Sequence, residues 1–275
     1  MTPQTQSFLD LLEHELRANT GFVRIHAAEV LVEHGYGFKV SPLFQVEADS
    51  TTPGYRVGVW RVLVRNAKDE AERRRFADRI RRVMLDSAAP DRVGAAESLA
   101  KLNLPNRLDR PALEQWLEAA DDATAAFPLW LLVLSSDATE RARDEARLAR
   151  LLESPDPIAR LRASFGLGRL EKVSAESIGK LSARARVEPA DSPARAYLFG
   201  AALLHAPRGS AAATAFKDQL LGVFGHGKAN EQFEAATVIG LRGSPDDLPA
   251  LIRLLKSNEA DARIGAAGGL LRLLP

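Results

Sequence analysis

The fold is decided by a repeated stretch, whose clearest copy reads Asp156-Pro157-Ile158-Ala159-Arg160-Leu161-Arg162-Ala163-Ser164-Phe165-Gly166-Leu167-Gly168-Arg169-Leu170. Its core is an arginine followed, three residues later, by two residues that are usually small or apolar. Further copies of this core begin at residues 23, 55, 91, 194, 231 and 262, and a degenerate copy begins at residue 127. The copies recur about every 34 residues, and a period of this size is typical of helical repeat proteins.

Composition excludes several classes of protein. The 275 residues are 46% hydrophobic and 27% charged, as in ordinary folded domains. The net charge is only +1, so we do not expect a nucleic acid partner. The absence of cysteine excludes disulfides and thiolate metal ligands and fits a cytoplasmic location. No signal peptide or long apolar run is visible, so no membrane contact is expected.

Apolar residues recur with helical spacing along almost the whole chain, and strand-like alternation is nearly absent. We therefore predict an all-α fold of about eight helix pairs. The first helices are expected near residues 4–17, 41–48, 68–86, 110–119, 138–153, 174–186, 210–224 and 245–256. The second helices carry the repeated core and are expected near residues 21–34, 53–66, 90–102, 122–135, 157–170, 192–205, 228–242 and 259–273.

Local signals mark where these helices should begin and end. A capping residue followed by proline is a typical helix start, and it occurs at residues 2–3, 41–42, 154–155, 192–193 and 244–245. Asp109 and Asp156 can serve as caps in the same way. Glycines are expected to end helices at positions 35, 209, 225 and 243. No long linker is visible, so residues 1–275 are interpreted as one repeat domain, with residues 1–135 less regular than residues 136–275.

The repeated core resembles HEAT repeats, in particular the HEAT-like repeats of the phycobilisome-lyase type. The resemblance covers nearly the whole chain, because many copies agree in phase. It implies a right-handed α-α superhelix, an α-solenoid whose second helices line a concave face. Many activities are built on such repeats, so the resemblance implies no single activity.

An alignment of the second helices shows where the repeats differ. The position two residues after the arginine holds His26, Gly58, Gly94, Pro128, Arg162, Tyr197, Glu234 and Gly265. Three residues further, the first three repeats carry the charged residues Glu29, Arg61 and Glu97. The position immediately before these charged residues usually holds a small residue, but it holds Trp60 in the second repeat and Trp130 in the fourth. Charged and aromatic residues therefore gather in the first four repeats, which predicts a ligand pocket there.

The candidate binding residues of this hypothesis are charged or aromatic residues in or next to the repeated core. They are Tyr55, Arg56, Trp60, Arg61, Asp91, Arg92, Glu97, Phe127, Trp130, Arg195 and Tyr197. Arg61 is the leading candidate, because a guanidinium can bind an anionic group with two hydrogen bonds. A structural interpretation stays open, since Glu–Arg–Glu rows also form ion-pair networks between helices and tryptophans also fill gaps between repeats.

His26 and Glu29 are the candidate catalytic residues. They stand three residues apart on one helix face, and histidine titrates near neutral pH. Glu33 extends this stripe, but no second histidine occupies the matching positions, so no metal site is expected. No phosphate-binding or dinucleotide motif is present, and no cofactor is expected.

The resemblance and the gathered residues favour a binding or scaffolding protein. It would hold a protein partner or a small anionic or polar ligand in its concave groove. The alternative is an enzyme, lyase-like or isomerase-like, with an active site in the N-terminal repeats. A bilin lyase is one concrete version of this alternative, although no residue specifically supports it.

Overall fold

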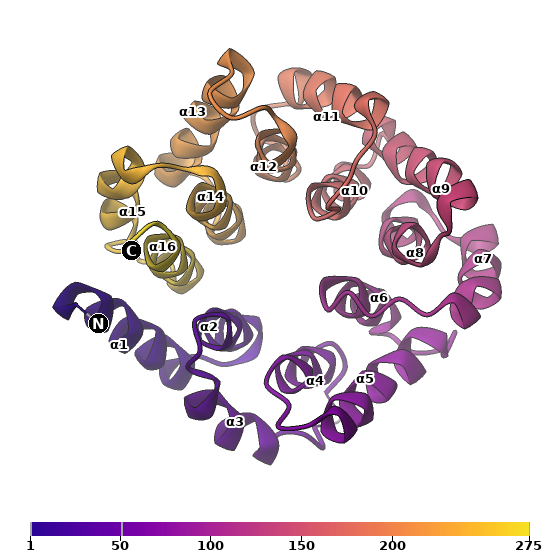
Figure 1. The fold of residues 1–275 in the computed structure, drawn as a ribbon, viewed down its shortest axis with the longest axis horizontal. Coiled ribbons are helices and arrows are strands. Elements are labelled where there is room, and N and C mark those ends of the chain that lie inside the picture. Colours follow the sequence, from indigo (N-terminus) through magenta and orange to yellow (C-terminus); the bar gives the residue numbers. More distant parts are fainter. Residues whose placement is uncertain (1, 51, 275) are drawn as a thin grey trace. The chain divides into compact units, whose positions relative to one another are not determined.

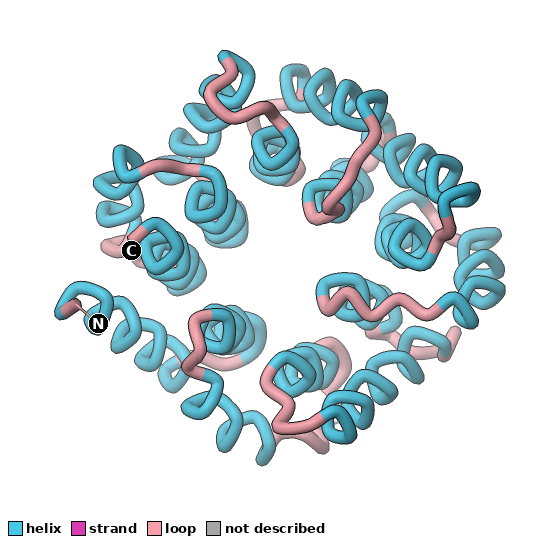
Figure 2. Tube along the Cα trace, viewed as in Figure 1, coloured by secondary structure: helices cyan, strands magenta, loops and turns pink. Residues whose placement is uncertain are grey.

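The computed structural model describes residues 2–50 and 52–274 of the chain. Within these residues the protein has sixteen α-helices, three short 3-10 helices and no strand (Figure 2). Helices that are close in sequence pack on one another, which is consistent with a helical repeat. The all-α fold predicted from the sequence is confirmed.

Packing groups the described residues into two compact units. Unit 2 is continuous, from Gly35 to Ser174, whereas unit 1 joins the residues up to His34 with those from Ala175 onward. Within each unit the first helices of the pairs form one layer and the second helices form another (Figure 1). The division at residue 135 that the sequence suggests stays a prediction.

Unit 2 contains four helix pairs. Its first helices are α3 (Gly37–Val46), α5 (Glu70–Leu85), α7 (Arg110–Ala119) and α9 (Ala138–Arg150). Its second helices are α4 (Tyr55–Arg65), α6 (Arg92–Lys101), α8 (Asp122–Ser135) and α10 (Pro157–Gly168). The short helix η1 (Arg107–Asp109) leads into α7, and η2 (Leu151–Glu153) follows α9.

Unit 1 also contains four helix pairs. Its first helices are α1 (Pro3–Ala18), α11 (Ala175–Val187), α13 (Ala211–His226) and α15 (Leu248–Leu254), the last preceded by η3 (Pro245–Asp247). Its second helices are α2 (Gly21–Glu33), α12 (Arg195–His205), α14 (Ala229–Arg242) and α16 (Ala260–Leu273).

Some helix ends follow the local signals, and others do not. Thr2 caps α1 as expected, whereas α10 is capped by Asp156 rather than Ser154. The predicted start at Ser41-Pro42 is wrong, because α3 begins at Gly37 and contains Pro42. The Asn66 side chain donates hydrogen bonds to the carbonyl of Gly37 and to Ser41, so a residue distant in sequence holds this helix start.

Three further expected boundaries shift by a few residues. Gly209 does not end α12, which stops at His205 with Ala206 as its C-cap. Ser192 does not cap α12; its hydroxyl accepts a hydrogen bond from the Ala194 backbone and donates one to Glu188, and the helix begins at Arg195. Gly225 does not end α13, which continues to His226 and stops at Gly227.

In five of the eight pairs the repeated arginine, or the glutamine that replaces it, ties the second helix to the end of the first helix. Its side chain donates a hydrogen bond to a backbone carbonyl just after the first helix or at its end. These bonds are Arg92 to Met84 (2.8 Å), Arg160 to Ser154 (2.7 Å), Arg195 to Glu188 (3.4 Å), Gln232 to Phe224 (3.0 Å) and Arg263 to Ser257 (2.7 Å). The core arginine therefore satisfies carbonyls that the helix end leaves without a partner.

The small residues after the arginine permit close helix packing. Ala95 and Ala96 in α6, and Ala266 and Ala267 in α16, are 0% exposed. A Cβ added at Gly240 of α14 would lie 2.6 Å from the Cα of Gly269 in α16, so the two backbones touch. Small residues therefore lie where the second helices α14 and α16 meet.

In unit 1 the first helix pair packs on the last. Arg263 of α16 bonds Glu15 of α1 at 2.6 Å, and Glu15 is only 2% exposed. Arg272 of α16 pairs with Glu33 of α2. The Val30 side chain of α2 lies against α16, 3.1 Å from where a Cβ at Gly268 would stand. Helix α16 is therefore covered by α14 and also by α1 and α2.

Candidate functional site

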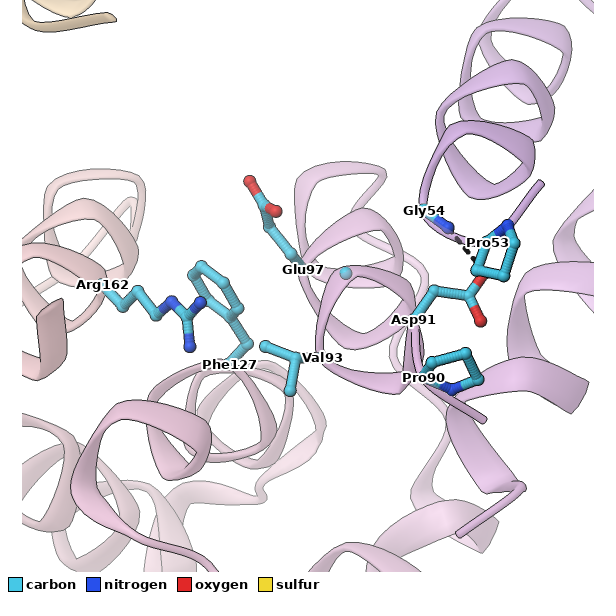
Figure 3. Close-up of a pocket in the computed structure, with 9 residues that line it drawn as sticks. Pro53, Gly54, Pro90, Asp91, Val93, Glu97, Phe127 and Arg162 are labelled. Atoms are coloured by element: carbon cyan, nitrogen blue, oxygen red, sulfur yellow. Dashed lines mark hydrogen bonds between the residues drawn. The ribbon is translucent and has the colours of Figure 1, made fainter. Parts of the chain in front are cut away.

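Unit 2 contains a pocket of about 320 Å³ between its second helices. Residues before α4, in α6, in α8 and in α10 contribute to it. Figure 3 shows Arg162 and Phe127 on one side, Asp91 with Pro53 and Gly54 on the other, and Glu97 between them. The lining residues are Pro53, Gly54, Pro90, Asp91, Val93, Gly94, Glu97, Phe127 and Arg162.

Asp91 joins the start of α4 to the start of α6. Its carboxylate accepts two hydrogen bonds from the Arg56 guanidinium, both of 2.8 Å, and one of 3.0 Å from the Gly54 backbone. Gly54 can offer its N–H in this way because its φ of +78° is a conformation that favours glycine. The bidentate pair locks two successive repeats together at the edge of the pocket.

The environment of Asp91 keeps its carboxyl ionised. Burial alone would raise the pKa, but the hydrogen bonds from Arg56 and Gly54 outweigh burial, and the pKa of Asp91 is lowered. The hydrogen bonds that Arg56 donates to Asp91 likewise raise the pKa of Arg56. At neutral pH the pair is therefore a stable ion pair rather than a proton donor or acceptor.

Glu97 is the second acidic residue of the pocket. It lies on α6, and its carboxylate forms an ion pair with Lys101 one turn later, at 2.8 Å. The Lys101 ammonium also lies 4.9 Å from the centre of the Phe165 ring. Both carboxylates of the pocket thus have cationic partners.

Arg162 is the cationic residue of the pocket. It projects from α10, and its Nη1 donates a hydrogen bond of 2.9 Å to the Ala123 carbonyl at the start of α8. Its guanidinium lies 5.5 Å from the centre of the Phe127 ring. Among the described residues no carboxylate lies within 4.0 Å of this guanidinium, although Asp121 is near enough to be influenced by its charge.

An aromatic cluster supports this side of the pocket. The Trp130 and Phe165 rings meet edge to face with centroids 5.9 Å apart, and Phe127 lies 6.4 Å from Trp130. Trp130 is 2% exposed, and its indole N–H has no hydrogen-bond partner in the described part of the chain. The cluster fixes the Phe127 ring, which is 6% exposed, as a rigid wall of the pocket.

The other predicted binding residues of unit 2 do not line the pocket. Trp60 is 7% exposed, and its indole N–H donates to the Ala48 carbonyl at 2.7 Å. Arg61 is 3% exposed and donates to Ser98 at 3.0 Å. Arg92 lies over the Trp116 ring at 3.9 Å, and the Tyr55 hydroxyl bonds Glu47. The structure therefore brings Asp91, Glu97 and Phe127 together in the pocket, while Trp60 and Arg61 are packed in the core.

The candidate catalytic residues belong to unit 1. His26 of α2 stacks on Phe233 of α14, with ring centroids 4.5 Å apart, and its Nδ1 lies 2.9 Å from the Asp261 carboxylate of α16. Glu29 is on the same helix, one turn later. These contacts place His26 where the first helix pair meets the last.

The two remaining predicted binding residues are also in unit 1. Arg195 of α12 bonds the Gln219 side chain at 3.1 Å and lies 5.2 Å from the centre of the Phe199 ring. The Tyr197 hydroxyl is 3.5 Å from the Asn230 amide. Both side chains make contacts within the helix layers of this unit.

Sequence reasoning missed most of the pocket wall. Arg162 stands at the repeat position of His26 and Gly94, where a charge is unusual, and that signal could have identified it. Pro53, Gly54 and Pro90 lie in the turns before α4 and α6, and Val93 and Gly94 lie in the first turn of α6. Pro53, Gly54 and Pro90 lie outside the repeated core, and Val93 and Gly94 lie within it but carry no charge or ring that would mark a site. Their convergence depends on the packing of neighbouring pairs.

Searches for related proteins found no matching family model and no similar curated protein. Within residues 2–50 and 52–274 no three His, Asp or Glu side chains are grouped to hold a metal ion. None of the described helices is both long and apolar enough to cross a bilayer. The function is therefore inferred from the pocket and its charges.

Proposed function

We propose that this chain is a binding protein of the HEAT-like type, with the unit 2 pocket as its contact site. In this proposal the helix pairs wind into a right-handed solenoid, and the second helices present the binding face to a ligand or to a segment of a partner protein. The repeated arginine and the small residues after it support the assignment to HEAT-like repeats.

One observation carries the proposal: four successive repeats each contribute residues to a single pocket. Gly54 comes from the first repeat of unit 2, Glu97 from the second, Phe127 from the third and Arg162 from the fourth. Helical repeat proteins bind through surfaces assembled in this way from neighbouring repeats. A volume of about 320 Å³ lies at the lower end of ligand pockets, which suits a small molecule or one or two side chains.

The pocket chemistry favours binding over catalysis. A general base needs a pKa near the working pH, whereas the pKa of Asp91 is lowered by its bonds to Arg56 and Gly54. The Glu97 carboxylate is engaged by Lys101. A lyase-like or isomerase-like activity remains the alternative, with His26 held by Asp261 as its candidate acid or base.

The test is a variant that fills the pocket without disturbing the fold. A Cβ added at Gly94 meets no atom within 4 Å, and Gly94 lines the pocket, so we expect the ring of Gly94→Phe to occupy the space of the pocket. Gly179→Phe is the matched control, because Gly179 is also helical, is exposed, and has equally open surroundings. Melting curves verify that both variants fold.

Binding is then measured by saturation-transfer NMR with a defined mixture of amino acids, organic acids, amines and acetylated dipeptides. We expect some members of the mixture to bind the wild type and the Gly179→Phe control but not Gly94→Phe. If every ligand that binds is insensitive to Gly94→Phe, the pocket is not the binding site and the proposal fails.

A further inference from the structure

The charged residues around the unit 2 pocket differ in whether a counter-ion touches them. Asp91 is paired with Arg56, and Glu97 is paired with Lys101. The Arg162 guanidinium bonds the Ala123 carbonyl instead of a carboxylate; Asp121, whose carboxylate accepts hydrogen bonds from Thr124, acts on Arg162 only through its charge. A half-buried guanidinium gains from a carboxylate that bonds it directly.

Arg162 is also oriented for recognition. Its Nη1 hydrogen bond to the Ala123 carbonyl and its position over the Phe127 ring fix the plane of the guanidinium. One N–H is used by Ala123, and a guanidinium carries five, so donors remain for an incoming group. A guanidinium held in this way can bind a carboxylate through two parallel hydrogen bonds.

The rest of the pocket is suited to an apolar body. Phe127 presents a ring fixed by the aromatic cluster, and Val93, Pro53 and Pro90 add aliphatic surface. The Arg162 side chain and the Phe127 ring lie beside each other in Figure 3, so the charged and apolar contacts are adjacent. A ligand that carries a ring or aliphatic group next to a carboxylate matches both.

We propose that the unit 2 pocket binds a carboxylate that bears an apolar group, with Arg162 as its anion-binding residue and Phe127 as its apolar wall. The proposal rests on the pocket being a binding site and adds the class of its ligand. The same chemistry is offered by a free organic acid and by an acidic residue beside an aromatic one in a peptide.

Two matched probe pairs test this assignment and distinguish the two sources. Benzoate and benzamide share a shape and differ in charge. The acetylated, amidated tripeptides Phe-Glu-Phe and Phe-Gln-Phe do the same for a peptide. Dissociation constants are measured by NMR titration with wild type, Arg162→Gln, Arg162→Lys, Gly94→Phe and Arg74→Gln. Arg74 is the control, because it lies on α5 with a side chain that is 75% exposed.

We expect at least one acid to bind about tenfold or more tightly than its neutral counterpart, because the acid alone forms charge-assisted hydrogen bonds. Arg162→Gln should remove this preference, Arg162→Lys should keep only part of it, and Arg74→Gln should leave it unchanged. The preference should also weaken as salt is added. The probe pair with the larger preference identifies the source of the carboxylate.

Other outcomes overturn the assignment in distinguishable ways. If an acid and its neutral counterpart bind equally and Gly94→Phe abolishes both, the pocket binds ligands but does not select carboxylates. If neither acid binds at millimolar concentration, or if Arg162→Gln and Arg162→Lys both retain the preference while melting like the wild type, the assignment to Arg162 is wrong. If binding survives Gly94→Phe, the pocket itself is not the site.

Discussion

Gly94 in α6 and Gly265 in α16 occupy the same position of the repeat, two residues after the core arginine, yet their surroundings are opposite. A Cβ at Gly94 would meet nothing within 4 Å, because the position opens into the unit 2 pocket. A Cβ at Gly265 would lie 2.9 Å from the Cα of Phe233 in α14. The same residue at the same repeat position leaves space for a ligand in one unit and permits contact between backbones in the other.

The difference arises from the neighbours rather than from the glycine. In unit 1 α16 is packed between α14 and the first helix pair, and its glycines allow this close approach. In unit 2 the residue at the matching position of α10 is Arg162, whose side chain extends over Phe127 and borders the pocket. Residues at the same position of aligned repeats therefore lie at equivalent places in the helix pairs. Packing by the neighbouring helices determines whether such a residue is buried in the core or lines a pocket.

The largest expected change in stability comes from adding a methyl group at Gly265, where α16 is closely packed. Gly265→Ala should lower the free energy of unfolding by about 3 kcal/mol, because the new Cβ overlaps the Phe233 backbone and the helices must separate. Urea denaturation followed by circular dichroism measures the change. A loss below about 0.5 kcal/mol would show that α14 and α16 are not in close contact.

The next effect concerns the polar bond between the first and last helix pairs. Glu15→Gln should cost about 2 kcal/mol, since it removes the charge that Arg263 bonds at 2.6 Å in a largely buried setting. Glu70→Gln, at a carboxylate that is 57% exposed and pairs with Arg74 on α5, is the matched control and should cost about 0.5 kcal/mol or less. Equal losses in the two variants would contradict the burial of the Glu15–Arg263 pair.

At Gly94, which borders the pocket, an added methyl group should not reduce the free energy of unfolding as it does at Gly265. Gly94→Ala should leave stability unchanged or raise it by up to about 1 kcal/mol, because alanine favours the helix and its Cβ meets no neighbour. The same urea experiment applies. A loss as large as that of Gly265→Ala would mean that the two positions do not differ.

The smallest effect is a dependence on pH within unit 2. Four aspartates of this unit, Asp91, Asp121, Asp137 and Asp144, have a lowered pKa, and that of Asp137 falls to about 2 because the Glu140 backbone and Arg107 donate to it. A lowered folded-state pKa gives stability that is complete above the unfolded value near 4 and is lost as the pH falls further.

We therefore expect hydrogen exchange in α6, α8 and α9 to accelerate as the pH is lowered from about 4 to about 2, after correction for the intrinsic exchange rate. Asp137→Asn should flatten this dependence at the start of α9, where Asp137 is the N-cap. Carboxyl NMR titration of Asp137 gives its pKa directly. A midpoint at the ordinary value would contradict the role of Arg107 and the helix cap.

The sequence predicts the helix pairs well because their signals are local. Thr2 and Asp156, which the sequence identified as caps, each cap a helix that begins at the next residue. Asp121 and Asp137 cap helices in the same local way. The start of α3 was not predicted, because it has no capping side chain of its own and its first turn is bonded by Asn66 at the end of α4. The packing of α1 and α2 on α16 was also missed, since a repeat pattern predicts contact between consecutive pairs and says nothing of the first with the last.

The candidate site was predicted in part for the same reason. Asp91, Glu97 and Phe127 were identified because they are charged or aromatic residues near the repeated core. Trp60 and Arg61 are likewise aromatic or charged, but they are buried, with Ala48 and Ser98 as hydrogen-bond partners. A sequence column cannot distinguish these two outcomes, because they depend on which neighbouring side chain reaches the same space.

The contact between Glu15 and Arg263 also has a consequence for the nascent chain. The two residues are separated by 248 positions, so α1 and α2 leave the ribosome long before α16 exists. At about 5–20 residues per second the delay is on the order of ten seconds or more. Unit 2 is continuous in sequence and can fold during that interval. The surface of α2 around Val30 has no contact with α16 until α16 has been synthesised. Translation therefore orders the two units in time, with the unit that holds the pocket complete first.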